Sequence, residues 1–264
     1  MRAVRVPPRA LRPVGVALVD KPAGPSSFAL VGALRRRTGA RTGHAGTLDP
    51  FATGLLVLLS GAATRLAPCF VGLDKRYVTD VDLTSTTSTG DPEGAQLETH
   101  DAPSEVGLDA SLARLRGEVE LPIPAASAVK IGGERAYRLA RQGIAVDMPS
   151  RRSQVYALDV IAYTSDTVRL SLHVSSGTYV RAIAVALGGH CTSLRRTAVG
   201  PFSVDEAEPF GPGPAGGDDG APLPVLLPVA TALRRLPEDA VDRVPHAVVA
   251  GVLALEDGTG GEAA

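Results

Sequence analysis

The chain has 264 residues, of which 44% are hydrophobic and 21% charged, so it can bury a substantial core as an ordinary globular protein. Its two cysteines lack a Cys-x-x-Cys spacing and are too few for a disulfide scaffold, which suits a reducing cytoplasm. The apolar run after the N-terminal arginines is too short for a membrane span and does not have the pattern of a secretory signal peptide.

The net charge of −1 hides a split between two parts of the chain. Residues 1–200 carry a charge of +7, whereas residues 201–264 carry −8. A net-basic region with clustered arginines is consistent with a polyanionic partner such as a nucleic acid. Any single arginine run is more often ordinary solvated surface. The clusters are Arg35-Arg36-Arg37, Arg151-Arg152 and Arg195-Arg196.

The first third of the chain predicts strands and one helix. Apolar residues 14–20 and 55–59 predict buried strands, and the alternating residues 77–83 predict a half-buried strand. A helix is expected over residues 28–37, because Ser26 or Ser27 can cap its start and Gly39 can end it.

The middle of the chain predicts an exposed excursion followed by mixed helices and strands. Residues 84–100 are rich in Thr, Ser, Gly and Asp and predict the excursion. Strands are expected over residues 153–164, 167–174 and 194–199, with a tight turn at residues 165–166. Helices are expected over residues 108–116, over 134–142 with Gly143 as the stop, and over 179–187 with Thr178 as the cap.

The composition changes abruptly at Gly211. Residues 211–221 are rich in glycine and proline and predict a flexible linker after a main domain of residues 1–210. Residues 222–264 are acidic and marginal in length for an independent fold, and we expect disorder in their Gly/Glu-rich end.

The segment from Gly43 to Gly54 is the clearest candidate for a site of chemistry. Its three glycines and Pro50 predict a shaped loop and not the interior of a helix or strand. Asp49 is the only acidic residue between Lys21 and Leu73, in a stretch with many arginines. Such a carboxylate should stay ionised and could act as a nucleophile or orient a cation. The plainer interpretation is that Asp-Pro merely starts a turn.

Other chemistries have little support in the sequence. No Gly-Lys-Ser/Thr and no Gly-x-Gly-x-x-Gly follows a predicted strand, which argues against an NTPase or a dinucleotide enzyme. The five histidines show no spacing typical of metal ligands. A glycosidase would need a second carboxylate, for which Asp20 and Asp74 are nearest in sequence. We expect neither a cofactor nor a metal.

Motifs spread in order over residues 14–204 carry a more specific signal. They are Leu18-Val19-Asp20-Lys21-Pro22, Gly43-His44-Ala45-Gly46-Thr47-Leu48-Asp49-Pro50, Ala52-Thr53-Gly54-Leu55-Leu56, Lys75-Arg76-Tyr77, Ser127-Ala128-Val129-Lys130, Ala136-Tyr137, Gly177-Thr178-Tyr179-Val180-Arg181 and Leu194-Arg195-Arg196. This ordered set closely resembles the TruB family of tRNA pseudouridine synthases, which isomerise the T-loop uridine at tRNA position 55. The resemblance implies an α+β pseudouridine synthase fold, with a mixed, mostly antiparallel sheet and flanking helices around a central RNA-binding cleft.

The resemblance also implies an isomerase, an intramolecular transferase, and assigns three catalytic residues. Asp49 would be the catalytic carboxylate, Arg181 would pair with it, and Tyr77 would stack on the target base and serve in proton transfer. Moving the glycosidic bond from N1 to C5 of uracil requires no redox step. A carboxylate near C1′ or the 2′ position suits both a covalent sugar adduct and a glycal route.

Four further residues are assigned to substrate binding by the same resemblance. Tyr179 and Leu194 would line the uridine pocket, since an extruded base needs apolar and aromatic surroundings. His44 would fill the space that the flipped nucleotide leaves in the T-loop, and Lys21 would brace the active-site loop. Taken singly, a tyrosine or leucine at such positions is more often ordinary core packing.

The sequence departs from the family pattern at two places. Residues 122–126, just before Ser127, include small residues and an extra proline where relatives often carry a bulkier residue, which puts the local packing of the pocket in question. Residues 222–264 do not match the PUA or PUA-like RNA-binding domain that usually follows, and their acidity argues against phosphate contact. We expect them to be a degenerate or truncated PUA-like region that adds little affinity for RNA.

The preferred function is therefore a tRNA uridine-55 pseudouridine synthase that works as a monomer on the T-arm of tRNA. One alternative is a synthase of the same superfamily acting on another RNA. A guide-dependent relative is disfavoured because the chain lacks a basic C-terminal extension, so no guide RNA is expected. The other alternative is a noncatalytic tRNA-binding or folding module.

Overall fold

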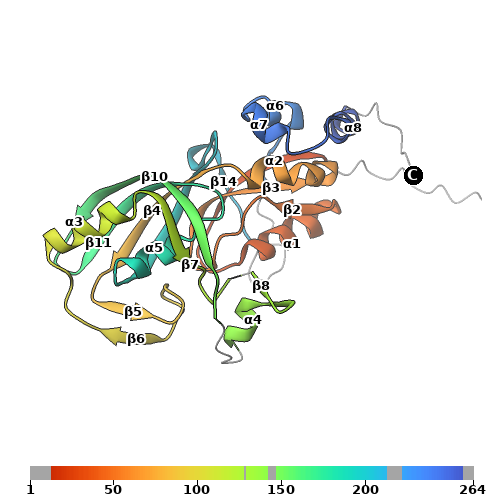
Figure 1. Cartoon of the computed structure of the whole chain (residues 1–264). Helices are drawn as coiled ribbons and strands as arrows, with labels where there is room; N and C mark the ends of the chain where they lie inside the picture. Colours follow the sequence, from red (N-terminus) through yellow and green to blue (C-terminus); the bar gives the residue numbers. More distant parts are fainter. Residues whose placement is uncertain (1–12, 128, 142–146, 213–221, 258–264) are drawn as a thin grey trace, which may run out of the picture.

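The architecture is a mixed sheet with helices packed on it. The computed structural model describes residues 13–127, 129–141, 147–212 and 222–257 (Figure 1). The 11-stranded sheet in these ranges comprises β1 Gly15–Lys21, β2 Thr42–His44, β3 Thr53–Ser60, β4 Lys75–Asp82, β7 Gly117–Pro122, β10 Ser150–Tyr163, β11 Thr167–Val174, β12 His190–Val199, β13 Phe202–Ser203, β14 Glu208–Pro209 and β15 Leu226–Leu227.

The strand order is β14-β1-β3-β12-β4-β11-β10-β7, with β13 beside β12, β15 beside β1 and β2 beside β3. The pairs β1–β14 and β3–β12 are parallel, and the other pairs of this sheet are antiparallel. Two small hairpins lie outside it: β5 Ser85–Thr87 with β6 Gln96–Thr99, and β8 Lys130–Ile131 with β9 Glu134–Arg135. The expected mixed, mostly antiparallel sheet is confirmed.

A short parallel pairing joins the two halves of the sheet. In this pairing Arg195 lies opposite Thr53 and Arg196 opposite Gly54. Gly54 has a φ of 101°, and a Cβ there would collide with the backbone carbonyl of Arg196. Glycine is therefore required at this crossing, because a side chain would separate the strands. The loop that carries Asp49 enters the sheet at this junction.

The helices cover the sheet in three hydrophobic clusters. They are α1 Ser27–Thr38, α2 Ala67–Val71, α3 Glu105–Arg114, α4 Ala136–Arg141, α5 Val180–Ala186, α6 Val229–Leu233, α7 Glu238–Val241 and α8 His246–Glu256, with 3-10 turns at Gly61–Leu66 and Val204–Glu206. One cluster packs α3 and α5 on β4, β10 and β11, and another packs α1 on β1 and β3. No described helix is long and apolar enough to span a membrane.

Most predicted elements are present with shifted ends. The expected cap and stop of α1 are confirmed, because Ser26 Oγ accepts a hydrogen bond from the Ala29 N–H and Gly39 has a φ of 66°. β12 begins at His190, earlier than expected, since its first residues pair with β4. The cap expected at Thr178 is wrong: its hydroxyl donates to the Ser175 carbonyl instead, and Tyr179 is the N-cap residue before α5.

Some predictions fall partly or wholly outside the described residues. A single helix is expected over residues 134–142, but β9 occupies its start and α4 the remainder to Arg141. The stop at Gly143, the motif residue Ala128, the N-terminal arginines, most of the linker and the Gly/Glu-rich end lie outside the described ranges. The expected loop over residues 43–54 is shortened at both ends, because its first two residues belong to β2 and its last two to β3.

The C-terminal helices share a hydrophobic cluster with the sheet. Side chains of α6, α7 and α8 pack with Leu55, Val57 and Leu59 of β3 and with Phe70 of α2. Figure 1 places these helices at one end of the molecule, beside α2 and β3. Glu256 at the end of α8 accepts hydrogen bonds from two N–H groups at the start of α6. The acidic segment therefore completes a core that β3 alone would leave exposed.

We expect Leu233→Ala to lower the free energy of unfolding by about 2–5 kcal/mol, because Leu233 is 8% exposed within this cluster. Urea denaturation measures the change. Leu223→Ala is the matched control, since Leu223 is in the same segment but 41% exposed, and its stability should be nearly unchanged. Equal stability of the two variants would contradict a shared core. Truncation after Pro209 would remove all three helices. The stability of that variant must therefore be measured before any change in its RNA binding is interpreted.

Candidate active site

Lys21 holds the loop that carries Asp49. We call residues 45–52, between β2 and β3, the Asp49 loop. Lys21 Nζ is fully buried and donates to the carbonyl oxygens of Pro22, Pro50 and Ala52 at 2.8, 3.0 and 2.6 Å. Burial lowers the pKa of Lys21 to about 8, although nearby Asp49 opposes the shift. Because the three carbonyls accept all three protons of the ammonium, the charged form of Lys21 holds the Asp49 loop in place at Pro50 and Ala52.

Arg196 and Ser27 hold the rest of the Asp49 loop. Arg196, in β12, is 1% exposed and donates to the carbonyls of Gly46, Thr47 and Leu55 at 3.1, 3.3 and 2.7 Å. Ser27 Oγ, at the start of α1, donates to the Leu48 carbonyl at 2.9 Å and accepts from the Leu48 N–H at 2.8 Å. Segments far apart in sequence thus fix the backbone on both sides of Asp49.

Arg181 meets Asp49 across 132 residues of sequence. Its Nη2 donates to Asp49 Oδ1 at 3.4 Å, and its Nε lies 3.0 Å from Oδ2 without hydrogen-bond alignment. The Arg181 side chain is 3% exposed, whereas Asp49 remains 32% exposed. The arginine is therefore sequestered, and the carboxylate stays accessible to a substrate.

A second carboxylate, Asp91, completes this site, and no pattern in the sequence predicts it. Asp91 Oδ2 lies 3.0 Å from Arg181 Nη1, and its side chain is 5% exposed. The same guanidinium donates to the carbonyls of Thr89 and Ala126 at 2.7 and 2.9 Å. The prediction that residues 84–100 form an exposed excursion is therefore wrong at Asp91, because the turn between β5 and β6 reaches back to α5. No spacing in the sequence links Asp91 to Asp49.

Burial raises the pKa of Asp49, and the charge of Arg181 opposes that shift. Asp91 raises the pKa further as a like charge, while Lys21 lowers it. Asp49 is therefore less isolated than its sequence neighbourhood predicts. Its proton affinity depends on a buried arginine shared between two carboxylates.

Three of the predicted pocket residues lie near this pair. Tyr77 in β4 and Leu194 in β12 are 8% and 7% exposed and belong to one cluster with Leu48 and Ala52, which flank Asp49. Tyr179 is half-buried at the N-terminal end of α5, two residues before Arg181. An apolar and aromatic wall thus adjoins the carboxylate.

His44 lies on a different side of the loop. It is in β2, and its ring meets the Phe28 ring edge to face, with centroids 5.0 Å apart at 79°. Burial lowers the pKa of His44, and the charge of Arg196 lowers it further. Its Nδ1 is buried without a hydrogen-bond partner.

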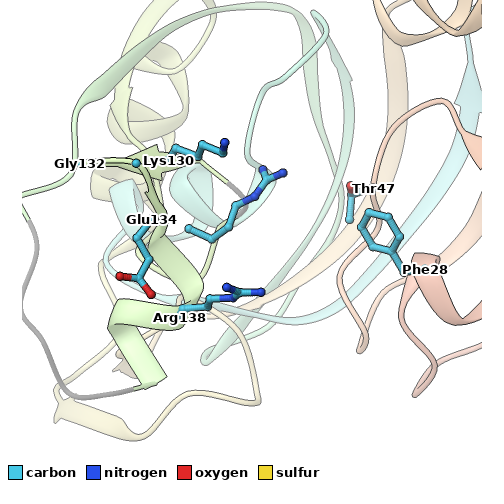
Figure 2. Close-up of a pocket in the computed structure, with 8 residues that line it drawn as sticks. Phe28, Thr47, Lys130, Gly132, Glu134 and Arg138 are labelled. Atoms are coloured by element: carbon cyan, nitrogen blue, oxygen red, sulfur yellow. The ribbon is translucent and has the colours of Figure 1, made fainter.

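A cavity of about 980 Å³ opens between α1 and the β8–β9–α4 unit. Figure 2 shows Phe28 and Thr47 on one side of it and Lys130, Glu134 and Arg138 on the other. Arg135 also lines it. Thr47 belongs to the Asp49 loop, so this cationic cavity adjoins the site.

We expect Lys21→Met to slow turnover by roughly a hundredfold through misplacement of Asp49, and to lower the free energy of unfolding by about 3 kcal/mol. The methionine would leave the Pro50 and Ala52 carbonyls without their donor. Single-turnover kinetics and urea denaturation measure the two effects. Lys130→Met is the control, since Lys130 is exposed and its replacement should leave the free energy of unfolding unchanged. A stable and fully active Lys21→Met protein would contradict the bracing role of Lys21.

The chain is similar in sequence to known pseudouridine synthases. The profile described as TruB family pseudouridylate synthase (N terminal domain) matches residues 35–180. The tRNA pseudouridine synthase B of Mycobacterium sp. (strain KMS) is 43% identical over 209 residues, which cover 74% of this chain and 70% of that protein. The protein of the same name from Aromatoleum aromaticum is 44% identical over 203 residues, covering 73% and 65%.

Solved structures give the same fold. A chain of a Cbf5-Nop10-Gar1 complex aligns with a TM-score of 0.56 and 29% identity, covering 74% of this chain and 51% of that chain. A chain of an H/ACA RNP bound to a substrate RNA aligns with a TM-score of 0.52 and 26% identity, covering 73% and 50%. This chain therefore spans about half the length of those two.

Proposed function

The chain belongs to the TruB family of pseudouridine synthases, and we infer from this that it is a tRNA pseudouridine synthase that isomerises the T-loop uridine at position 55. The single observation that supports the assignment of chemistry is the Arg181–Asp49 pair, with Asp91 on the same guanidinium. A partly exposed carboxylate held by a buried arginine has the charge and access that glycosidic bond transfer requires.

Asp49 is the catalytic carboxylate in this proposal. Its ionised oxygen attacks C1′ of the target nucleotide, or removes the 2′ proton in a glycal route, and either step releases uracil from N1. Arg181 favours the ionised form against the burial that raises the pKa of Asp49. After the base has turned, C5 bonds to C1′ while the Asp49–C1′ ester bond breaks or, in the glycal route, while Asp49 returns the proton to C2′, and the C5 proton is then lost to restore the aromatic ring. Tyr77 is the proposed participant in that proton transfer.

The target base must leave the RNA stack to reach Asp49. In our proposal Tyr77, Tyr179 and Leu194 line the pocket that receives and retains it, since base-flipping enzymes stack the extruded base on apolar and aromatic side chains. His44 fills the gap left in the T-loop. Lys21 and Arg196 act as positioning residues that keep the Asp49 loop in place.

The chain acts as a cytoplasmic monomer on the T-arm of tRNA without guide RNA, cofactor or metal. Residues 1–210 form the catalytic domain, residues 211–221 a linker, and residues 222–264 a C-terminal segment that adds little affinity for RNA. The charge of −8 over residues 201–264 supports the last point.

Mapping of pseudouridine in an unmodified tRNA transcript after incubation with the protein tests the function. We expect one product, at uridine 55. Product at another uridine would favour a different RNA substrate, and tight binding without product would favour a noncatalytic module. Transcripts with uridine 55 changed to cytidine control for modification elsewhere.

A further inference from the structure

Phe28 is an exposed aromatic ring at the edge of the cationic cavity. It lies in the first turn of α1 and is 69% exposed, more than any other phenylalanine or tyrosine whose side chain the structure describes. Its ring lines the cavity, and binding sites are typically concave surfaces lined by aromatic side chains with a few polar groups. The catalytic arrangement proposed above does not use this residue.

The position of Phe28 is fixed relative to Asp49. The neighbouring Ser27 makes two hydrogen bonds to Leu48 of the Asp49 loop, at 2.8 and 2.9 Å. The Phe28 ring also meets the His44 ring edge to face, with centroids 5.0 Å apart. Two rings thus meet edge to face on a rigid support beside the Asp49 loop.

The opposite wall of the cavity is cationic. Lys130 and Arg138 are exposed there, and Figure 2 shows the Arg138 guanidinium extending toward Phe28. Glu134 is the acidic lining residue, and its carboxylate is turned away from Phe28 in the same view. Aromatic rings facing positive side chains suit unpaired nucleotides, whose bases stack while their phosphates meet the cations.

We propose that Phe28 is a stacking platform for an unpaired T-loop base adjacent to the flipped uridine, beside His44, with Lys130 and Arg138 meeting the flanking phosphates. The proposal rests on the function proposed above, because it takes the RNA that enters the cavity to be the one that reaches Asp49. Thr47 lines the cavity only two residues before Asp49, so its occupant continues into the reacting nucleotide. Phe28 is thereby a specificity-determining residue and not a catalytic one.

Substitutions at Phe28 in the full chain test the platform. Phe28→Ala should weaken tRNA binding at least about fivefold, because a stacked base loses its partner, while the rate at saturating tRNA stays the same. Phe28→Trp should restore binding, and Phe28→Leu should not, since leucine keeps apolar area without an aromatic face. Tyr156→Ala is the matched control: Tyr156 is 56% exposed, and its ring centroid lies 4.8 Å from that of His173, but it does not line the cavity.

A fluorescent base gives a second readout. 2-Aminopurine placed at each T-loop position in turn should be quenched at one position on binding to the wild-type chain, and that quenching should be lost with Phe28→Ala. Full affinity of Phe28→Ala, or rescue by Phe28→Leu, would overturn the platform while leaving pseudouridine formation intact. Absence of any pseudouridine with the wild-type chain would instead defeat the proposed function.

Discussion

Asp49→Asn should abolish pseudouridine formation, with a loss of roughly four orders of magnitude or more in single-turnover rate. The amide cannot attack C1′ or accept the 2′ proton, so both routes lose their first step. tRNA affinity should stay within a few-fold of wild type, because the cationic cavity and the pocket wall are untouched. Mapping of pseudouridine and filter binding measure the two quantities.

The control for Asp49→Asn is that the variant protein folds as stably as the wild type. The asparagine side chain keeps the shape of the aspartate, and Arg181 retains Asp91 as a charged partner, so the free energy of unfolding should change little. Thermal denaturation of both proteins checks this. Undiminished turnover in a well-folded Asp49→Asn protein would refute the catalytic role of Asp49, and loss of folding would call for Asp49→Ser as a second variant.

Arg181→Gln should lower the free energy of unfolding by about 3 kcal/mol and reduce turnover severely. It leaves the nearly buried Asp91 and the partly buried Asp49 without their shared positive charge. Burial and Asp91 then raise the pKa of Asp49 further, because the opposing guanidinium is gone. The proposed mechanism uses the ionised carboxylate, so the acidic limb of the pH profile of kcat/KM should move to higher pH.

The same pKa shift predicts how stability depends on pH. A carboxyl group whose folded pKa is raised stabilises the fold below its unfolded pKa, and this contribution is lost as pH rises through the folded pKa. Arg181→Gln should therefore be less destabilised in acid than at neutral pH, which urea denaturation at several pH values measures. Asp91→Asn should move the acidic limb to lower pH, since Asp91 raises the pKa of Asp49. Shifts in the same direction for both variants would contradict this electrostatic scheme.

Local patterns predicted most of the elements and the irregular segment that carries Asp49. Alternation and apolar runs predicted β1, β3, β4, β10 and β11, because strand burial depends on near neighbours in sequence. Ser26 and Gly39 predicted the ends of α1 for the same reason: a cap and a stop act within one turn. The glycines and Pro50 predicted a shaped segment around Asp49, and the motif order predicted the family.

Local patterns failed where a residue's role depends on a distant partner. The hydroxyl of Thr178 found an acceptor in the preceding turn, so the expected cap did not form. Arg195 and Arg196 look alike in the sequence, but Arg195 pairs with Asp20 and stays half-exposed, while Arg196 is buried under the Asp49 loop. Residue type alone could not separate a surface ion pair from a buried brace.

The sequence thus singled out Asp49 as the candidate catalytic carboxylate, since Asp49 lies in a distinctive motif, but not what sets its proton affinity. That depends on Asp91, which the fold brings to the same guanidinium from a hairpin that looked like exposed coil. Charge interactions act through space and are strongest where water is excluded, so they follow tertiary distance and not separation along the chain. For the same reason only the structure places Phe28 beside His44 and opposite the cations of the cavity.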